Sequence, residues 1–447
     1  MLARRPLLTL APLAACALAL ALALAGCGKR ETAVDRANRE QVLLVSAGAG
    51  LTDLDPQLAT SVGEFNVLLA FFEGLTDLDP ASLEPVPAIA ERWETSTDGR
   101  TWTFHLSPAA RWSDGRPLTA QDLVASWRRL LSPALASDYA SLLHCLAGAE
   151  DFHRGRTTDF SQVGVSARND HTLELRVARP TPELPALLAL PPLFPVPLHV
   201  IAQCGATDRR GNAWTRCATF VGNGPFRLTR WRYGHQIDAE RAATYRAAGA
   251  VRLRGVRFQL TENLETEERM FRAGQLHVIS ALSIGRIPEW RRRQSPALRT
   301  VPYFGTDFLR VNVSRPPLDD PRVRRALALA IDREQLAARA LLGTKSPAPT
   351  LVPSGFPGYE PPAGQALALG EARRLLAAAG YPAGKGLRPL QLLYNSSDQH
   401  RVVFETIQEM WRRDLGVQVE LANQDEKIVR QNRKLGEYDL LRSSWTA

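Results

Sequence analysis

Residues 90–131 read AERWETSTDGRTWTFHLSPAARWSDGRPLTAQDLVASWRRLL and form the most ordered local pattern in the chain. An Asp-Gly pair at 98–99 precedes the alternating run 101–106, as expected of a hairpin whose turn needs a positive φ. After a second Asp-Gly pair, Thr119 and Asp122 have the spacing of a capping box before an apolar helical stripe. The segment therefore predicts a strand–strand–helix module, and residue chemistry alone favours a packed core over a catalytic site.

The same segment resembles a known family. Its order W-x-F-x-L, A-x-W-S-D-G-x-P-L-T-A-x-D and S-W-R-R-L is similar to the signature region of the bacterial extracellular solute-binding proteins of the peptide and nickel type, and most of all to the oligopeptide-binding proteins of ABC importers. Further blocks match in order, among them N-G-P-F at 223–226 and D-D-P-R-V-R-R-A-L-A-L-A-I-D-R at 319–333. The resemblance implies an α/β fold of the type II periplasmic binding protein class, with three subdomains in two lobes around a cleft.

The N-terminus has the features of an export signal. Two arginines precede an Ala/Leu run that ends at L-A-G-C, residues 24–27. This end resembles a bacterial lipobox, so we expect residues 1–26 to be a lipoprotein signal peptide that is cleaved before Cys27, and the Cys27 thiol to be lipidated. An ordinary signal peptide and a retained membrane anchor are the alternatives.

Composition and charge bound the class of protein. The 447 residues are 45% hydrophobic and 23% charged, which is ordinary for a soluble globular protein of two or three lobes. The formal charge of +9 is scattered along the chain, whereas nucleic-acid binding needs a clustered basic face with aromatic side chains. Cys204 and Cys217 flank a polar loop, and we expect them to form a disulfide in an oxidising compartment.

The domain boundaries follow from the matched blocks and from breaks in the pattern. We expect lobe I at 27–72 and 198–304, an inserted subdomain at 73–197, and lobe II at 301–447. Seven prolines between 180 and 197 interrupt an apolar run, so neither a regular helix nor a central strand is expected there. This proline-rich segment is interpreted as a crossover between lobes.

Lobe II has a clear βαβ pattern. A strand from Leu390, a helix, a stop at Gly416 and a second strand predict a parallel pair with a right-handed crossover. A helix over 425–435 and a strand over 438–442 follow. Because the family it resembles continues well past this point, we expect the chain to be C-terminally incomplete and its last strand to lack neighbours.

The resemblance also suggests how a ligand is bound. The loop Y-N-S-S-D-Q-H at 394–400 matches the family's Y-N-S/T-S-D-x-H loop, which implies that Asn395 and His400 lie near the C-terminal carboxylate of a peptide. Arg433 and Arg442 match arginines that neutralise the carboxylate of peptides of different length. A guanidinium group is suited to that role because it makes charge-assisted, forked hydrogen bonds. His400 taken alone is more often a surface helix cap.

Two further matches complete the predicted site. Tyr139 matches a tyrosine of the inserted subdomain that touches the ligand, and residues 443–446 match an edge stretch that pairs with an extended peptide as an added strand. The predicted ligand-binding residues are Tyr139, Asn395, His400, Arg433, Arg442, Ser443, Ser444, Trp445 and Thr446.

The chain departs from the family pattern at three places. Thr60 stands where an acidic contact is usual, and Glu426 where an aromatic residue is common. The aspartate that holds the peptide's α-amine follows Trp-x-Ala directly, and here Ala447 is the last residue. These departures affect the expected length and affinity of the ligand, and we expect the 447-residue chain to bind peptide poorly without the missing continuation.

The functional prediction is a substrate-binding lipoprotein of an ABC transporter. No G-x-S-x-G, H-E-x-x-H, C-x-x-C or phosphate-loop motif is present, so we expect no enzyme activity, no cofactor and no metal site. The resemblance implies a monomer in the periplasm or cell envelope that captures short peptides in a closing cleft and delivers them to a permease. The alternatives are another ligand (murein peptide, dipeptide, nickel chelate or oligosaccharide) or a non-transport envelope lipoprotein or chaperone.

Overall fold

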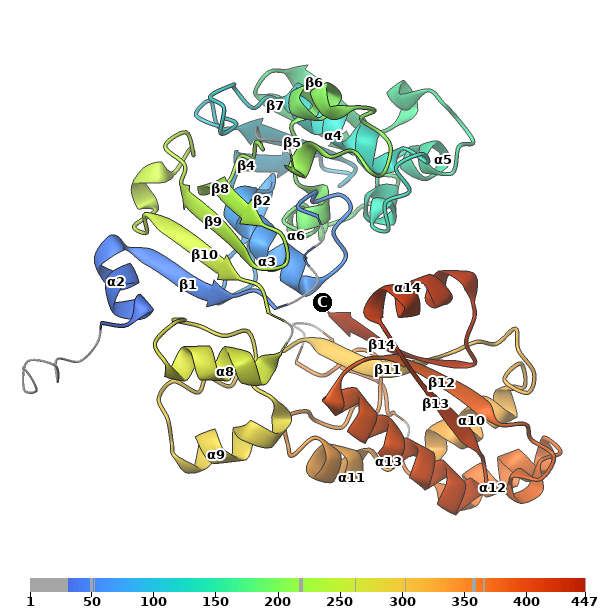
Figure 1. Ribbon diagram of the computed structural model, residues 1–447. Helices are drawn as coiled ribbons and strands as arrows, with labels where there is room; N and C mark the ends of the chain where they lie inside the picture. Colours follow the sequence, from blue (N-terminus) through green and yellow to red (C-terminus); the bar gives the residue numbers. More distant parts are fainter. Residues whose placement is uncertain are drawn as a thin grey trace, which may run out of the picture. The chain divides into compact units, whose positions relative to one another are not determined.

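The computed structural model describes residues 31–48, 51, 53–216, 220–261, 263–301, 303–355, 359–364 and 366–446. The chain divides into two compact units, Met1–Ala281 (unit 1) and Leu282–Ala447 (unit 2) (Figure 1). This division falls before the predicted start of lobe II, and the three-part division remains a prediction. The predicted signal peptide, Cys27, and Cys217 of the expected disulfide lie outside the described residues.

Unit 1 contains ten strands and seven helices among its described residues. The strands are β1 (Val42–Ser46), β2 (Thr76–Leu78), β3 (Pro85–Pro87), β4 (Ala90–Thr95), β5 (Thr101–Leu106), β6 (Val165–Asn169), β7 (Thr172–Arg176), β8 (Phe226–Arg232), β9 (Gln236–Arg241) and β10 (Gly255–Gln259). The helices are α2 (Ala33–Glu40), α3 (Val62–Phe71), α4 (Ala120–Leu131), α5 (Ala149–His153), α6 (Leu184–Leu187), α7 (Leu198–Ile201) and α8 (Leu264–Arg272).

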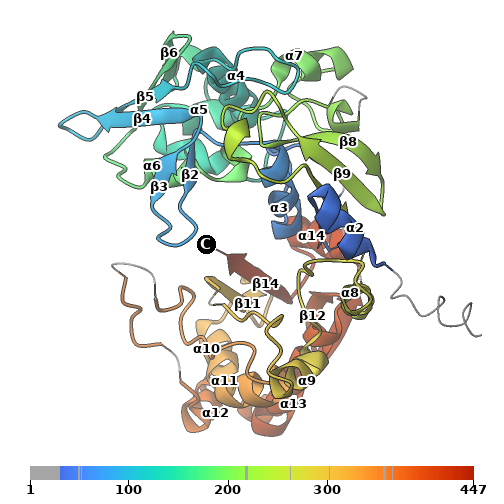
Figure 2. The same cartoon turned by 90° about the vertical axis from the view of Figure 1, so that its left-hand side faces the viewer.

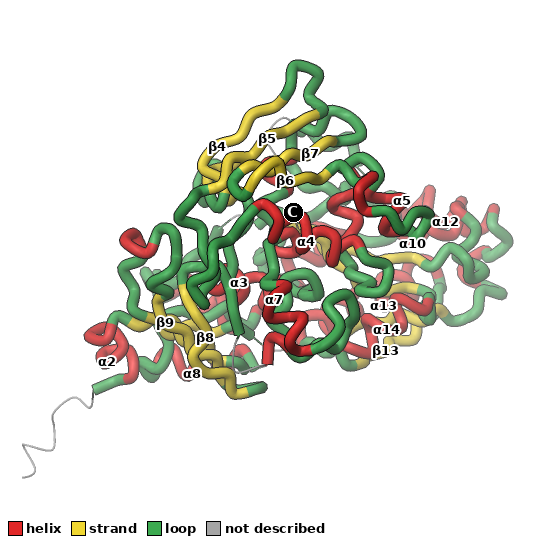
Figure 3. The backbone as a smooth tube through the Cα atoms, turned by 90° about the horizontal axis from the view of Figure 1, so that it is seen from above, coloured by secondary structure: helices red, strands yellow, loops and turns green. Residues whose placement is uncertain are grey.

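The strands of unit 1 form three sheets. One has the order β1-β10-β9-β8, in which β1 is parallel to β10 and the other pairs are antiparallel. A second, antiparallel sheet has the order β4-β5-β7-β6, and its four strands lie side by side in Figure 3. A short β2–β3 ribbon is the third (Figure 2). Buried side chains from both four-stranded sheets belong to one continuous hydrophobic core, so the predicted inserted subdomain shares its core with the rest of unit 1.

The predicted strand–strand–helix module is confirmed. β4 and β5 pair antiparallel across a turn in which Gly99 has φ of 66°, the left-handed region that glycine adopts without steric cost. Along β5, Trp102, Phe104 and Leu106 alternate toward the core. At the start of α4 the Asp122 carboxylate accepts hydrogen bonds from the Thr119 amide at 2.8 Å and the Thr119 hydroxyl at 2.9 Å.

Unit 2 contains four strands and six helices among its described residues. They are α9 (Ile287–Arg292), β11 (Gly305–Val311), α10 (Pro321–Leu329), α11 (Arg333–Gln335), α12 (Leu369–Ala378), β12 (Leu390–Asn395), α13 (Asp398–Leu415), β13 (Val419–Gln424), α14 (Glu426–Leu435) and β14 (Leu440–Thr446). None of the helices in the described ranges of either unit is both long and apolar enough to cross a bilayer.

The strands of unit 2 form one sheet of order β11-β14-β12-β13. β12 and β13 are parallel, which confirms the predicted βαβ unit, and α13 ends where Gly416 adopts a left-handed conformation. The expectation that the last strand lacks neighbours is wrong, because β14 lies between β11 and β12. The error arose because β11 was not predicted, so the antiparallel partner of β14 was missing from the expected sheet.

Helices cover both faces of this sheet (Figure 1). Leu390, Leu392 and Tyr394 of β12 pack into a core with residues of α10, α12 and α13. Leu393 points to the opposite face and packs with Val429 of α14 and with Leu441. Because side chains alternate along a strand, Arg442, which follows Leu441, faces the α13 side.

Candidate functional site

The strongest candidate site is a charged cluster in unit 2, made of Asp307, Lys345, His400 and Arg442. Asp307 lies on β11 and Arg442 on β14, and the register pairs Asp307 with Ser444 and Leu309 with Arg442. Asp307 and Arg442 are therefore diagonal neighbours on the same sheet face, close enough for long side chains to meet. His400 lies in the first turn of α13, directly after β12, and Lys345 comes from the loop beyond α11.

Two cations share one carboxylate in this cluster. Nη2 of Arg442 donates to Oδ1 of Asp307 at 2.8 Å, and the Lys345 ammonium contacts Oδ2 of the same carboxylate. Burial alone would raise the pKa of Asp307, but the contacts with Lys345 and Arg442 outweigh it and lower that pKa below the usual aspartate range. Nε of Arg442 is buried and has no hydrogen-bond partner among the described residues.

His400 is the third side chain of the cluster that carries nitrogen, after Lys345 and Arg442. Burial, together with the positive charge of Arg442, lowers the pKa of the His400 imidazole and so favours its neutral form. Its Nδ1 lies 3.3 Å from the carbonyl oxygen of Asn395 at the end of β12. A positive helix N-terminus, a guanidinium and an ammonium thus converge on one region, which favours an anionic ligand group.

The predicted strand-pairing stretch, 443–446, has one edge occupied. It pairs with residues 305–308 of β11, whereas β14 pairs with β12 at Leu440 and Leu441. Beyond Leu441, the second edge of β14 has no paired strand among the described residues. Ser444 and Trp445 are exposed, and Ser443 is buried with its hydroxyl 3.4 Å from Nε of Arg310.

The remaining predicted residues are placed elsewhere. Arg433 is exposed in the last turn of α14, and no contact between described residues joins it to Arg442 or His400. Tyr139 belongs to unit 1, where its ring packs edge-on against Phe65 with the ring centroids 5.8 Å apart. The structure therefore brings together Asn395, His400 and Arg442 within unit 2, and leaves the roles of Arg433 and Tyr139 as predictions.

Asp307 and Lys345 were not predicted as site residues. Asp307 interrupts the run Gly305–Val311, which was not recognised as a strand, and only the β11–β14 register reveals that it faces Arg442. With Thr306 and Arg310 in the same strand, β11 shows no apolar pattern that would have made Asp307 stand out. Lys345 reaches the cluster from a loop, and no local pattern marks it.

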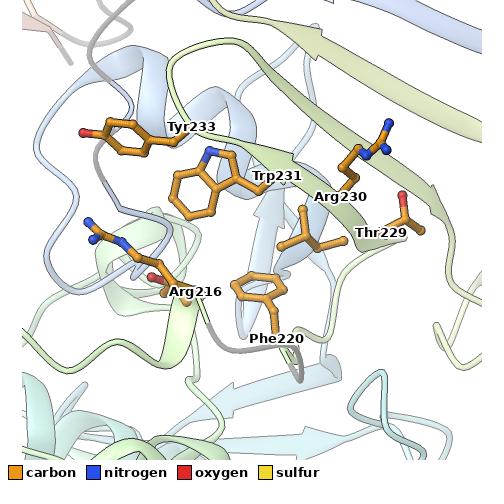
Figure 4. A pocket seen from close by; sticks show the side chains of 8 residues that line it. Arg216, Phe220, Thr229, Arg230, Trp231 and Tyr233 are labelled. Atoms are coloured by element: carbon orange, nitrogen blue, oxygen red, sulfur yellow. The ribbon is translucent and has the colours of Figure 1, made fainter.

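A pocket in unit 1 is the second candidate site. It has a volume of about 330 Å³ and is lined by Thr215, Arg216, Phe220, Leu228, Thr229, Arg230, Trp231 and Tyr233 (Figure 4). The Arg216 guanidinium lies 5.8 Å from the centre of the Tyr233 ring. None of the predicted ligand-binding residues lines this pocket. No group of three or more metal-ligating side chains occurs in the part of the chain that the structure describes.

Comparison with known proteins identifies the family. The family model for bacterial extracellular solute-binding proteins, family 5, matches residues 84–447. The probable deoxycholate-binding periplasmic protein YgiS of Escherichia coli is 35% identical over 405 residues, which are 88% of this chain and 73% of that protein. The periplasmic oligopeptide-binding protein OppA of Salmonella typhimurium is 33% identical over 417 residues, covering 91% and 75% of the two chains.

Solved structures agree with these matches. The murein tripeptide binding protein MppA of Escherichia coli superposes with a TM-score of 0.84 at 30% identity, covering 91% of this chain and 79% of that one. The mixed α/β sheets with helices on their faces are thus those of the type II periplasmic binding fold, as predicted. On the matched blocks, the extent of the family model and the shared fold, this chain belongs to the bacterial extracellular solute-binding proteins of family 5.

Proposed function

We propose that this protein binds short peptides and delivers them to the permease of an ABC importer. The cluster of Arg442, Lys345 and His400 beside the half-paired strand β14 carries this proposal. Guanidinium and ammonium groups suit the C-terminal carboxylate of a peptide, and a strand with one open edge suits its extended backbone. The names of OppA and MppA, an oligopeptide-binding and a murein tripeptide binding protein, support a peptide as ligand.

Each predicted residue has a proposed role. Arg442 and His400, together with the adjacent Asn395, would hold the peptide carboxylate, and Arg433 would serve a ligand of different length. Residues 443–446 would supply backbone hydrogen bonds, with Trp445 offering an exposed aromatic surface for a side chain of the peptide. Tyr139 would contact the ligand from unit 1. These roles require binding and positioning but no covalent chemistry.

Titration calorimetry with one short peptide, as free acid and as C-terminal amide, tests the proposal. The free acid should bind tighter, and Arg442→Ala should weaken it about ten- to a hundred-fold while leaving the amide unchanged, because a hydrogen bond to a charged group contributes roughly 1.5–3 kcal/mol. Arg412→Ala, which removes an exposed arginine paired with Glu409 in the same unit, is the matched control.

Two outcomes would contradict the assignment. Equal affinity of the wild type for acid and amide would exclude recognition of the carboxylate. Saturable binding of deoxycholate with no binding of peptide would instead indicate a ligand like the one in the name of the relative YgiS. Deoxycholate also carries a single carboxylate that the cationic cluster could bind.

We also propose that the protein works as a monomer in the periplasm or cell envelope, held by lipid on Cys27. The lipobox-like end of the N-terminal apolar run supports this. Replacing Cys27 with Ser should release the protein from the membrane fraction, because the lipid cannot attach without the thiol. Stable anchoring takes more than one acyl chain. If Cys27→Ser still fractionates wholly with membranes, the anchor is something other than this cysteine.

A further inference from the structure

Asp307 already pairs with two cations, Arg442 and Lys345, that the proposed function assigns to a ligand carboxylate. Each of its two oxygens contacts a different cation, Arg442 through Nη2 at 2.8 Å and Lys345 through its ammonium. The backbone sets this placement, because β11 and β14 are hydrogen-bonded neighbours over seven residue pairs. Asp307 is thus held in the cluster by the sheet itself.

The guanidinium of Arg442 is only partly used. Asp307 accepts a hydrogen bond from Nη2, while Nε is buried and has no hydrogen-bond partner among the described residues. A carboxylate prefers to bind a guanidinium with two parallel hydrogen bonds, so an incoming ligand would compete with Asp307 for Nη2 and would reach the buried Nε only after the side chains around it shift. An unsatisfied buried donor is costly, which favours a ligand that supplies the acceptor.

The charges in the cluster leave a net charge of one positive unit. Lys345 and Arg442 contribute two positive charges, Asp307 contributes one negative charge, and the lowered pKa of the His400 imidazole favours its neutral form. One positive charge remains, which a single ligand carboxylate neutralises. A second carboxylate on the same end of the ligand would face Asp307 without a cation to balance it.

We propose that Asp307 is a built-in competitor for the ligand carboxylate, which lowers the affinity of the site and restricts it to ligands with one carboxylate at this end. The inference rests on the proposed function, because it assumes that Arg442 meets a ligand carboxylate. It adds a specificity-determining residue that acts by repulsion and by occupying the cations, rather than by contact with the ligand.

The first test compares three proteins against the same peptide as free acid and as amide: wild type, Asp307→Asn, and Glu409→Gln as a control of equal charge change on an exposed pair. Removing the competing charge should raise the acid-over-amide affinity ratio about ten-fold in Asp307→Asn, as expected for roughly 1.4 kcal/mol of relieved repulsion. A peptide ending in a free aspartate should gain more. The ratio in Glu409→Gln should match that of the wild type. An unchanged ratio in Asp307→Asn would show that Asp307 does not compete with the ligand, and a lower ratio would show that it positions Arg442 instead.

The second test needs no peptide. Acetate replaces chloride at constant ionic strength, and NMR follows the Nε–H signal of Arg442. This signal is assigned by its loss in Arg442→Lys. Acetate should shift this signal at about ten-fold lower concentration in Asp307→Asn than in the wild type. Lys345→Gln, which removes the second cation and leaves Asp307 in place, should shift the midpoint the other way. Equal midpoints in the wild type and in Asp307→Asn would overturn the inference.

The two tests separate the two proposals. If the wild type does not distinguish peptide acid from amide, the proposed function fails, and the acetate titration still decides the role of Asp307. If peptide binding is as proposed but neither the affinity ratio nor the acetate midpoint changes in Asp307→Asn, only the competitor role fails. Circular dichroism of each variant establishes that the comparison is between folded proteins.

Discussion

Asp55 in unit 1 and Asp307 in unit 2 are both paired with an arginine, but the two pairs differ in burial and in how fully their polar atoms are used. The side chains of Asp55 and Arg129 are each 2% exposed. The side chains of Arg442 and Asp307 are 23% and 36% exposed. An ion pair that is removed from water must satisfy its polar atoms within the protein, whereas an exposed pair is under no such constraint.

The pair in unit 1 is saturated. Arg129 donates to both oxygens of Asp55 at 3.2 and 2.6 Å, to the side chain of Gln57 at 2.7 Å and to the carbonyl of Thr207 at 2.5 Å. The Trp214 indole adds a further hydrogen bond to Asp55 at 3.0 Å. Such a network links distant segments of unit 1 and has no capacity left for a ligand. The Arg442 guanidinium is not saturated in this way, because its Nε has no hydrogen-bond partner among the described residues.

The largest effect is expected from breaking the saturated pair. Arg129→Ala leaves the Asp55 carboxylate buried without its counter-charge and should reduce the free energy of unfolding by about 3–5 kcal/mol, measured by urea denaturation. Arg168→Ala, which removes the partner of Glu174 on the surface of unit 1, should cost at most about 1 kcal/mol. A loss from Arg129→Ala no larger than that of the control would mean that the network does not stabilise unit 1.

The ion pair of Asp439 with Arg388 is intermediate in burial between the two pairs compared above. The side chain of Asp439 is 3% exposed, while that of Arg388 is 46% exposed. Burial raises the pKa of Asp439, but hydrogen bonds from Arg388 and from the Gln391 amide outweigh it and lower the pKa below the usual aspartate range. Asp439→Asn should therefore cost about 1.5–3 kcal/mol of unfolding free energy near neutral pH.

The pH dependence of that loss has a definite sign. The folded pKa of Asp439 lies below the unfolded value of about 3.9. Its stabilising contribution is thus fully present above the unfolded pKa and is lost as the pH falls through the folded pKa. Urea denaturation at a series of pH values should show the wild type and Asp439→Asn converging in the acid range, and a constant difference down to low pH would contradict the assignment.

The smallest effect on stability is expected at the unsaturated cluster. Asp307→Asn removes a partly exposed, solvent-screened contact and should change the free energy of unfolding by no more than about 1 kcal/mol. The same variant is expected to alter ligand affinity about ten-fold. A large loss of stability here, comparable with that of Arg129→Ala, would mean that the cluster holds unit 2 together and would remove the contrast between the two pairs.

The sequence was most informative where structure is encoded locally. The Asp-Gly hairpin, the capped helix α4 and the βαβ unit depend on residues close together in the chain, and all three were predicted. The charged cluster depends on the pairing of β11 with β14, and its members Asp307 and Arg442 are 135 residues apart. Periodicity does not specify which strands pair, so His400 and Arg442 were found by resemblance to a family and Asp307 only from the register.

The central position of β14 has a consequence for the timing of folding. Its residues are synthesised after those of β11, β12 and β13, yet both β11 and β12 need it as a neighbour. The sheet of unit 2 therefore forms only after residues 305–446 have all left the ribosome, whereas β1 of unit 1 finds its partner β10 once residue 259 has been made. Long-range pairing of this kind slows folding and leaves strand edges exposed meanwhile. During synthesis, the edges of β11 and β12 that pair with β14 are expected to stay open until β14 has been made.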